Sequence, residues 1–207
     1  MSDSVVGRWS SFSVFLVGMV YIVALVIGFA TRGLSAPIVD PLLGIMETLT
    51  LIVAPLMLVM MAAIHGRASD ERKTVSAIAF AFMILMTGTT SAVHFVELTA
   101  MRQVASASLV WPSPAYALEL LAWDVFLGLS LAFAALTFED NGRERRVRRG
   151  LLVCGTLCLI GVLGPVVGNM RLQLVGVFAY GVLLPVVCLL LSRLFRDDVG
   201  SVIVRAT

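Results

Sequence analysis

Ionisable side chains are concentrated in one part of an otherwise apolar region of the chain, between residues 87 and 124. His94 and Glu97 lie at the end of one apolar stretch, and Glu119 and Asp124 lie in the first half of the next. Imidazole and carboxylate groups can bind a cation, transfer a proton or hold a divalent metal. Ionisable groups inside membrane segments are rare and mark candidate functional sites, so each of the four needs a physical explanation.

The composition indicates what kind of protein holds these groups. Of the 207 residues, 59% are apolar and 14% are charged, and the mean hydropathy is +1.01. A helix needs about 20 apolar residues to cross a bilayer, because lipid offers no partner to open backbone amides. The sequence therefore predicts an all-α, polytopic membrane protein in which residues 1–207 form a single integral membrane domain. Its six transmembrane helices are expected at residues 12–30, 43–64, 74–96, 115–138, 151–168 and 172–195.

Basic residues are distributed unequally between the two ends of these spans. Twelve of the 15 Lys and Arg residues fall on the side that carries both termini, and only Arg32, Arg102 and Arg171 fall on the other side. Short loops rich in Lys and Arg stay in the cytoplasm. We therefore expect a helical bundle in a plasma (inner) membrane, with both termini cytoplasmic.

The densest basic run, residues 143–149, lies between two predicted spans. In this position it is interpreted as a topology anchor that contacts anionic lipid headgroups. The expected partner of the chain is the lipid bilayer, with no nucleic-acid partner. The oligomeric state is left open.

The third predicted span places its polar residues on one stripe. Met83, Met86, Thr87, Thr90, His94 and Glu97 recur at helical spacing, which predicts that this stripe faces the bundle. The hydroxyl groups between residues 87 and 91 also suit close helix packing, with hydrogen bonds to neighbouring helices.

The fourth predicted span separates its two acids by angle. Glu119 and Trp123 are four residues apart and share a face, whereas Asp124 is turned about 140° from Glu119 in a regular α-helix. Asp124 also lies about 15 Å of helix rise beyond Pro114, near the middle of the membrane. A charged Asp there costs about 2.5 to 3.5 kcal/mol, so we expect this carboxyl to be paired, hydrated or protonated.

Polar residues of five spans fall at the same outer level, whereas the inner half of the spans holds almost none. The sequence predicts an outward-facing polar pocket that binds a small cationic ligand or ion from the outer side, with Arg102 and Arg171 at its rim and Tyr116 beside Trp123 as an aromatic wall. A pocket that opens only to the outer side is preferred over a transport path, because the inner half of the spans has no matching polar residues. The predicted ligand-binding residues are Glu47, His94, Glu97, Glu119, Trp123, Asp124, Asn169 and Gln173.

Three other interpretations remain open. His94 and Glu97, at i and i+3, could hold a divalent metal in a carboxylate-rich membrane enzyme, although His65 is expected at the opposite surface and leaves one imidazole for the site. The acids could instead pair with Arg32, Arg102 and Arg171 and set the helix register. The chain could also be a structural or sensor subunit that uses the pocket for docking.

The sequence lacks the residues that several other enzyme and cofactor classes require. No Gly-x-Ser-x-Gly motif or phosphate-binding loop occurs, and the single lysine, Lys73, lies in a predicted loop, which excludes a retinal Schiff base. The cofactor is left unknown apart from the divalent metal, and a non-enzymatic role is favoured.

Four parts of the sequence are similar to a known group of proteins. They are the basic loop, the Gly-rich fifth span, the Pro-containing last span and the segment Pro112-Ser-Pro-Ala-Tyr-Ala-Leu-Glu-Leu-Leu-Ala-Trp-Asp-Val-Phe-Leu-Gly-Leu. Over most of its length the chain resembles uncharacterised bacterial multi-pass membrane proteins of unknown function. The resemblance implies a six-span bundle and assigns no activity and no functional residue.

Overall fold

The computed structural model describes residues 2–33, 36–104 and 109–206, with the side chains of these residues up to residue 198. Within these ranges the chain consists of helices and connecting turns without strands, and six helices are long and apolar enough to cross a membrane. The predicted all-helical class and the number of spans are thus confirmed. Arg205, which was counted among the basic residues of one side, lies outside the described side chains.

The first three spans are single helices. They are α1 (Asp3–Arg32), α2 (Leu42–Arg67) and α3 (Lys73–Leu98), and α3 is flanked by the 3₁₀ helices η1 (Asp70–Arg72) and η2 (Met101–Gln103). Span four combines α4 (Pro114–Leu120), η3 (Leu121–Phe126) and α5 (Leu127–Ala135). Span five combines α6 (Glu144–Gly161) and α7 (Leu163–Val166), and span six combines α8 (Met170–Phe178), η4 (Ala179–Leu183) and α9 (Leu184–Ala206).

The helices do not end where the apolar stretches end. α1 begins at Asp3 and α6 begins at Glu144, both before the predicted spans, because a helix can continue beyond the apolar layer. The helix of span four ends at Ala135, before the predicted limit of 138. At the other end of this span Ser113 caps α4, since its hydroxyl accepts a hydrogen bond from the amide of Tyr116 at 3.2 Å and Pro114 follows at the first helical position.

Two of the spans are interrupted by π-helix in the middle. η3 and η4 are both π-helical, and each joins two α-helical segments without a break in the chain direction. A π-turn adds a residue to the helical turn and changes the direction in which the following side chains point. Such segments are frequent at functional sites.

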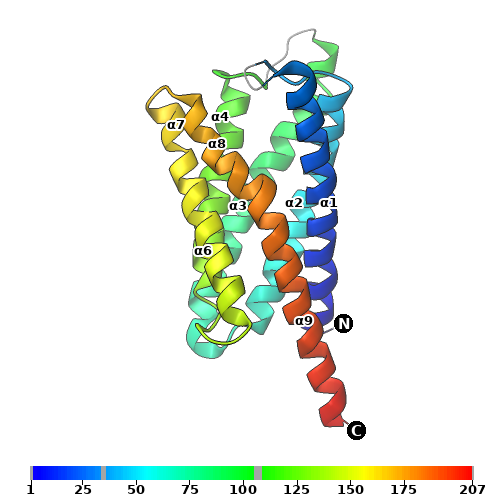
Figure 1. The fold of residues 1–207 in the computed structure, drawn as a ribbon, viewed down its shortest axis with the longest axis vertical. Coiled ribbons are helices and arrows are strands. Elements are labelled where there is room, and N and C mark those ends of the chain that lie inside the picture. Colours follow the sequence, from blue (N-terminus) through cyan, green and yellow to red (C-terminus); the bar gives the residue numbers. More distant parts are fainter. Residues whose placement is uncertain (1, 34–35, 105–108, 207) are drawn as a thin grey trace.

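The contacts between the six spans close a ring in chain order. α1 packs along α2, α2 along α3, α3 along α5, α5 along α6 and α6 along α8 and α9, while α9 packs back onto α1. Both ends of the chain lie at the same end of the bundle in Figure 1. We call this the near end and the opposite one the far end.

Apolar side chains fill the near half of the ring. Met57, Met60 and Met61 from α2 and Met83 and Met86 from α3 are almost completely buried. Every member of the predicted stripe on α3 is buried, which confirms the direction in which this stripe faces. The thiols of Cys154, Cys158 and Cys188 are free and buried in the same core.

Hydroxyl groups connect neighbouring helices through backbone carbonyls. Thr87 on α3 donates to the carbonyl of Ala54 on α2 at 3.2 Å, and Ser130 on α5 donates to the carbonyl of Ala79 on α3 at 2.8 Å. These bonds join three helices at buried positions, as expected where small polar residues allow close approach.

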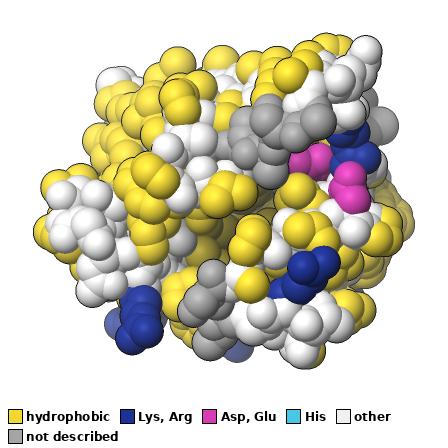
Figure 2. All heavy atoms as spheres, turned by 90° about the horizontal axis from the view of Figure 1, so that it is seen from above, with side chains coloured by type: hydrophobic (Ala, Val, Ile, Leu, Met, Phe, Trp, Pro, Cys, Tyr) yellow, Lys and Arg dark blue, Asp and Glu magenta, His cyan; other side chains and the backbone are white. Residues whose placement is uncertain are grey.

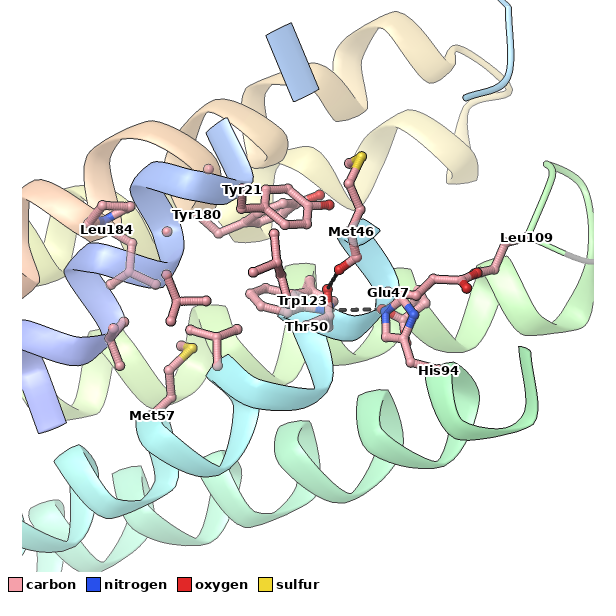
Figure 3. A pocket seen from close by; sticks show the side chains of 18 of the residues that line it. Tyr21, Met46, Glu47, Thr50, Met57, His94, Leu109, Trp123, Tyr180 and Leu184 are labelled. Carbon is pink, nitrogen blue, oxygen red and sulfur yellow. Dashed lines mark hydrogen bonds and ion pairs between the residues drawn. The ribbon is translucent and has the colours of Figure 1, made fainter. Parts of the chain in front are cut away.

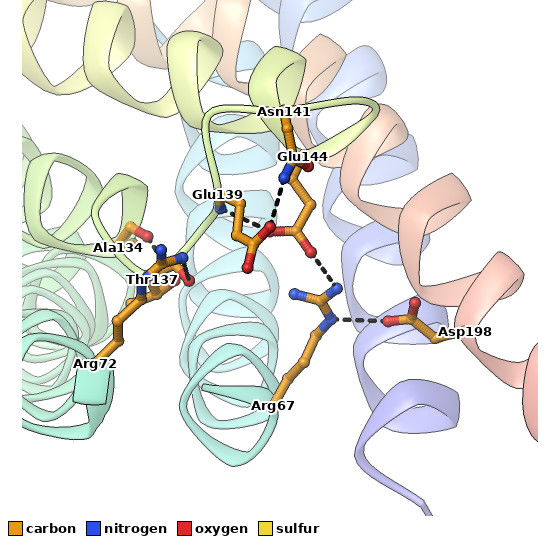
Figure 4. A network of polar contacts seen from close by, with 8 residues as sticks. All are labelled: Arg67, Arg72, Ala134, Thr137, Glu139, Asn141, Glu144 and Asp198. Carbon is orange, nitrogen blue, oxygen red and sulfur yellow. Dashed lines mark hydrogen bonds and ion pairs between the residues drawn. The ribbon is translucent and has the colours of Figure 1, made fainter. Parts of the chain in front are cut away.

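A charged network closes the near end (Figure 4). The guanidinium of Arg67, at the end of α2, donates to Glu144 of α6 at 2.6 Å and to Asp198 of α9 at 2.7 Å. The second oxygen of Glu144 accepts from the amide of Glu139 at 2.7 Å. One partly buried arginine thus holds three helices together at this end.

We predict that Arg67→Met lowers the stability of the detergent-solubilised protein by about 2 kcal/mol, because hydrogen bonds to charged groups contribute about 1.5 to 3 kcal/mol. Thermal unfolding followed by circular dichroism measures the effect. Arg193→Met, at an exposed position of the same end, is the matched control and is expected to change stability by less than about 0.5 kcal/mol. Equal melting temperatures for Arg67→Met and the parent protein would contradict the role of this network.

Candidate functional site

A cavity of about 210 Å³ lies in the far half of the ring. Side chains from α1, α2, α3, span four and span six line it, so that distant parts of the chain contribute to one site. Seen from the far end, hydrophobic side chains surround a hollow (Figure 2). Acidic side chains lie beside basic ones at one side of it, and other basic side chains lie elsewhere on this face. Buried apolar side chains pack against one another in the near half.

The carboxyl of Glu119 is held by three polar side chains. Its Oε2 atom accepts from Thr90 Oγ1 at 3.0 Å and from Trp123 Nε1 at 2.9 Å, and it lies 3.1 Å from His94 Nε2. Two of these residues come from α3 and the third follows Glu119 by one turn. The other carboxyl oxygen, Oε1, and His94 Nδ1 are buried without a hydrogen-bond partner among the described residues.

A second acidic group lies on the α2 side of the same end. Glu47 is buried, and its Oε2 atom lies 3.5 Å from the guanidinium of Arg102. The same guanidinium is closer to Asp40, at 2.8 Å. Glu97 is buried nearby and interacts electrostatically with Glu47. The expected pairing of acids with a rim arginine is therefore present for Glu47, but one guanidinium is shared between acids.

Aromatic side chains form one wall of the cavity (Figure 3). The rings of Trp123 and Tyr180 have centroids 5.2 Å apart, and Tyr21 from α1 lies beside Tyr180. The amide of Gln173 donates to the Tyr180 hydroxyl at 3.1 Å. The π-helices place Trp123 and Tyr180, one from each interrupted span, next to each other at this wall.

The end of the cavity nearest the core is apolar. Val14, Val53 and Met57 line it from α1 and α2, and Leu184 lines it from α9. Figure 3 shows Met57 and Leu184 at the opposite end from Glu47 and His94. Gly181 on η4 borders the same space, and a Cβ added there would meet no atom within 4 Å.

Asp124 points away from this cavity toward spans five and six. It is fully buried, and its Oδ1 atom occupies the space where a Cβ on Gly176 would lie, with Gly161 on its other side. Neither carboxyl oxygen has a partner at hydrogen-bond geometry among the residues that the structure describes, although the side chain of Gln173 is within electrostatic reach. The two acids of span four thus have separate surroundings, as their angular separation predicts.

The structure brings together five of the eight predicted ligand-binding residues. Those that line the cavity are Glu47, His94, Glu119, Trp123 and Gln173. Of the others, Glu97 lies near Glu47, Asp124 faces the glycines, and Asn169 caps α8, where its Oδ1 accepts from the amide of Arg171 at 3.1 Å.

Sequence reasoning missed three polar residues of the cavity, which are Tyr21, Thr50 and Tyr180. A tyrosine in the middle of an otherwise apolar span is the signal that could have identified two of them, because a buried Tyr hydroxyl needs a partner. Thr50 gave a weaker signal, since its hydroxyl bonds to the carbonyl of Met46 in its own helix at 3.0 Å.

The surroundings of His94 bear on the metal hypothesis. Glu119 occupies one ring nitrogen, and the described residues contain no group of three or more His, Cys, Asp or Glu side chains that could hold a metal ion. His65 lies at the near end, with its Nδ1 atom 2.8 Å from the hydroxyl of Ser76. The pair His94 and Glu97 therefore remains a prediction without a third ligand on the part of the chain that the structure describes.

Comparison of the chain with protein-family models, with curated proteins and with solved structures found no match. The function has to be argued from the site itself.

We predict that Gly176→Ala lowers stability by about 1 to 3 kcal/mol, the usual effect of overpacking a core, because the new methyl group collides with the carboxyl of Asp124. Thermal unfolding of the purified protein measures it. Gly88→Ala, where an added Cβ meets nothing within 4 Å, is the control and is expected to leave stability unchanged or slightly higher.

A double-mutant cycle identifies the cause. If the collision involves Asp124, the Gly176→Ala substitution will be tolerated better in an Asp124→Ala background than in the parent protein. Equal effects of Gly176→Ala in both backgrounds would contradict the contact between the two residues.

Proposed function

We propose that the chain is a multi-pass protein of the plasma membrane, with both termini in the cytoplasm, whose far-end cavity opens to the outside and binds a small cation or a small cationic ligand. The observation that supports this most directly is the carboxyl of Glu119. Three side chains fix one of its oxygens, and the other is buried without a partner in the part of the chain that the structure describes.

The formal charges around the far end favour a cation. The far end carries four acidic side chains, Asp40, Glu47, Glu97 and Glu119, against the three basic side chains Arg32, Arg102 and Arg171. The guanidinium of Arg102 is paired with Asp40 and Glu47. An arrangement with more carboxylates than cations attracts positive charge, and the attraction is stronger inside a low-dielectric bundle than in water. The aromatic wall contributes in the same direction, because the faces of Trp and Tyr rings attract cations.

A binding pocket is favoured over a channel by the contents of the near half. The core between the cavity and the near end consists of large, fully buried apolar side chains, among them Met60, Met61 and Ile64. A hydrated ion has no polar path through such a core. The site is therefore proposed to bind its ligand from the far end and release it there.

We expect a cation to stabilise the protein through Glu119. Melting temperatures measured with ethylammonium, butylammonium, Na⁺, Mg²⁺ and Zn²⁺ are expected to rise for at least one of these probes, by about 5 to 10 °C at a hundredfold excess over its dissociation constant. Glu119→Gln should lose most of this shift because the amide carries no charge.

The matched control is Glu71→Gln, which removes an exposed carboxylate at the near end and should keep the full shift. The proposal is overturned if no probe shifts the parent protein, or if Glu119→Gln and Glu71→Gln respond alike. Stoichiometric metal in the purified protein that is lost in His94→Ala would instead favour the metal-dependent alternative.

The orientation has its own test. The native thiols are buried, so a cysteine introduced at an exposed position can report which side it faces. In intact cells a membrane-impermeant maleimide is expected to label Arg32→Cys at the far end, and to label Arg146→Cys at the near end only after the cells are permeabilised. The reverse pattern would place the cavity on the cytoplasmic side.

A further inference from the structure

The cavity changes in character along its length. Toward the far end it is lined by Glu47, His94 and Glu119, and toward the core it is lined by Val53, Met57 and Leu184. On α2, the residues from Glu47 to Met57 span about 15 Å at 1.5 Å of rise per residue. The site is thus long, acidic at one end and apolar at the other (Figure 3).

An inorganic cation would use only the acidic end of such a site. It has no favourable interaction with valine, leucine and methionine side chains. An apolar lining stabilises a bound ligand only when the ligand buries apolar surface against it. The apolar half of the cavity is therefore unexplained by an ion, whereas a molecule with an apolar body uses both halves.

The polar end specifies the type of head group. Glu119 and His94 line the cavity, and within the described part of the chain their atoms Oε1 and Nδ1 are buried without a hydrogen-bond partner. When His94 Nε2 donates to Glu119, both atoms are acceptors, and they need N–H donors. A protonated primary or secondary amine supplies such donors, but a quaternary ammonium group does not.

We propose that the ligand of this cavity is an amphiphilic organic amine whose protonated head binds at Glu47, His94 and Glu119 and whose narrow apolar body extends along the aromatic wall toward Met57. This inference rests on the proposed function, since it names the class of cation that the pocket binds. It separates an amine with an apolar body from both inorganic ions and quaternary ammonium ions.

Gly181 offers a way to shorten the apolar half without touching the acidic half. A side chain there extends from η4 into open space. Gly181→Val should therefore obstruct the body of a long ligand while leaving the head-group residues in place. Gly88→Val, on the exposed side of α3 with equally open surroundings, controls for the substitution itself.

Trp123 serves as a local reporter of binding. The protein has three tryptophans, so the double variant Trp9→Phe and Trp111→Phe leaves Trp123, which lines the cavity, as the single fluorophore. Titrating this protein with n-alkylammonium ions from ethyl to octyl gives an affinity for each length. Affinity is expected to rise about fourfold per methylene, the equivalent of ~0.8 kcal/mol for each buried CH₂, and to stop rising once the body reaches the end of the cavity.

In Gly181→Val the affinity should stop rising at a shorter alkyl length. The affinity for octylammonium should fall more than tenfold, and the affinity for ethylammonium should be unchanged. Gly88→Val should follow the parent series, and Gly181→Ala provides a smaller obstruction if the valine variant does not fold. Neutral n-alkanols and tetraethylammonium are expected to bind weakly, and the n-alkanol series corrects for partitioning into detergent.

The outcomes separate this inference from the proposed function. If Na⁺, Mg²⁺ or tetraethylammonium binds in a Glu119-dependent manner and alkylammonium ions do not, the amine inference is wrong and cation binding stands. If affinity does not depend on chain length, or Gly181→Val weakens all lengths equally, the apolar half is not a binding surface. If no cation of any class binds, both proposals fail.

Discussion

A carboxyl group that needs hydrogen bonds from other helices determines how the helices of the far half are arranged. The polar side chains that reach Glu119 come from α3 and from the turn that follows it in span four. The contact between these two spans is therefore made by polar side chains at fixed distances. Small residues let helices approach closely, whereas larger polar side chains join them through hydrogen bonds across the interface. The cavity lies beside this polar contact.

The two halves of the bundle are consequently held by different forces. In the near half, methionine, leucine and cysteine side chains fill the ring, and Arg67 connects three helices at its end. In the far half, hydrogen bonds and one shared guanidinium connect the helices around a space. Packing that fills all space resists deformation, so the near half is suited to act as the rigid support of the site.

Much of the fold could be predicted from the sequence, because the rule that relates apolar length to membrane thickness is simple. The level of each polar group along its span could also be predicted, which is why Glu47, His94, Glu119 and Gln173 were expected together. What could not be predicted is the change of rotation in the middle of spans four and six. The π-helices η3 and η4 change the residue count per turn, and nothing in the apolar pattern of residues 121–126 or 179–183 indicates them.

The position of Asp124 has a consequence for how the chain is made. Its cover consists of Gly161 and Gly176, which belong to spans five and six. Gly176 is synthesised about 50 residues after Asp124, which takes roughly 3 to 10 s at 5 to 20 residues per second. During that interval the most deeply buried acid of the protein lacks the cover that Gly176 provides in the final fold. Span four therefore depends on its own apolar flanks, or on water and other polar contacts, until the last hairpin arrives, and assembly of this bundle is completed from the C-terminal side.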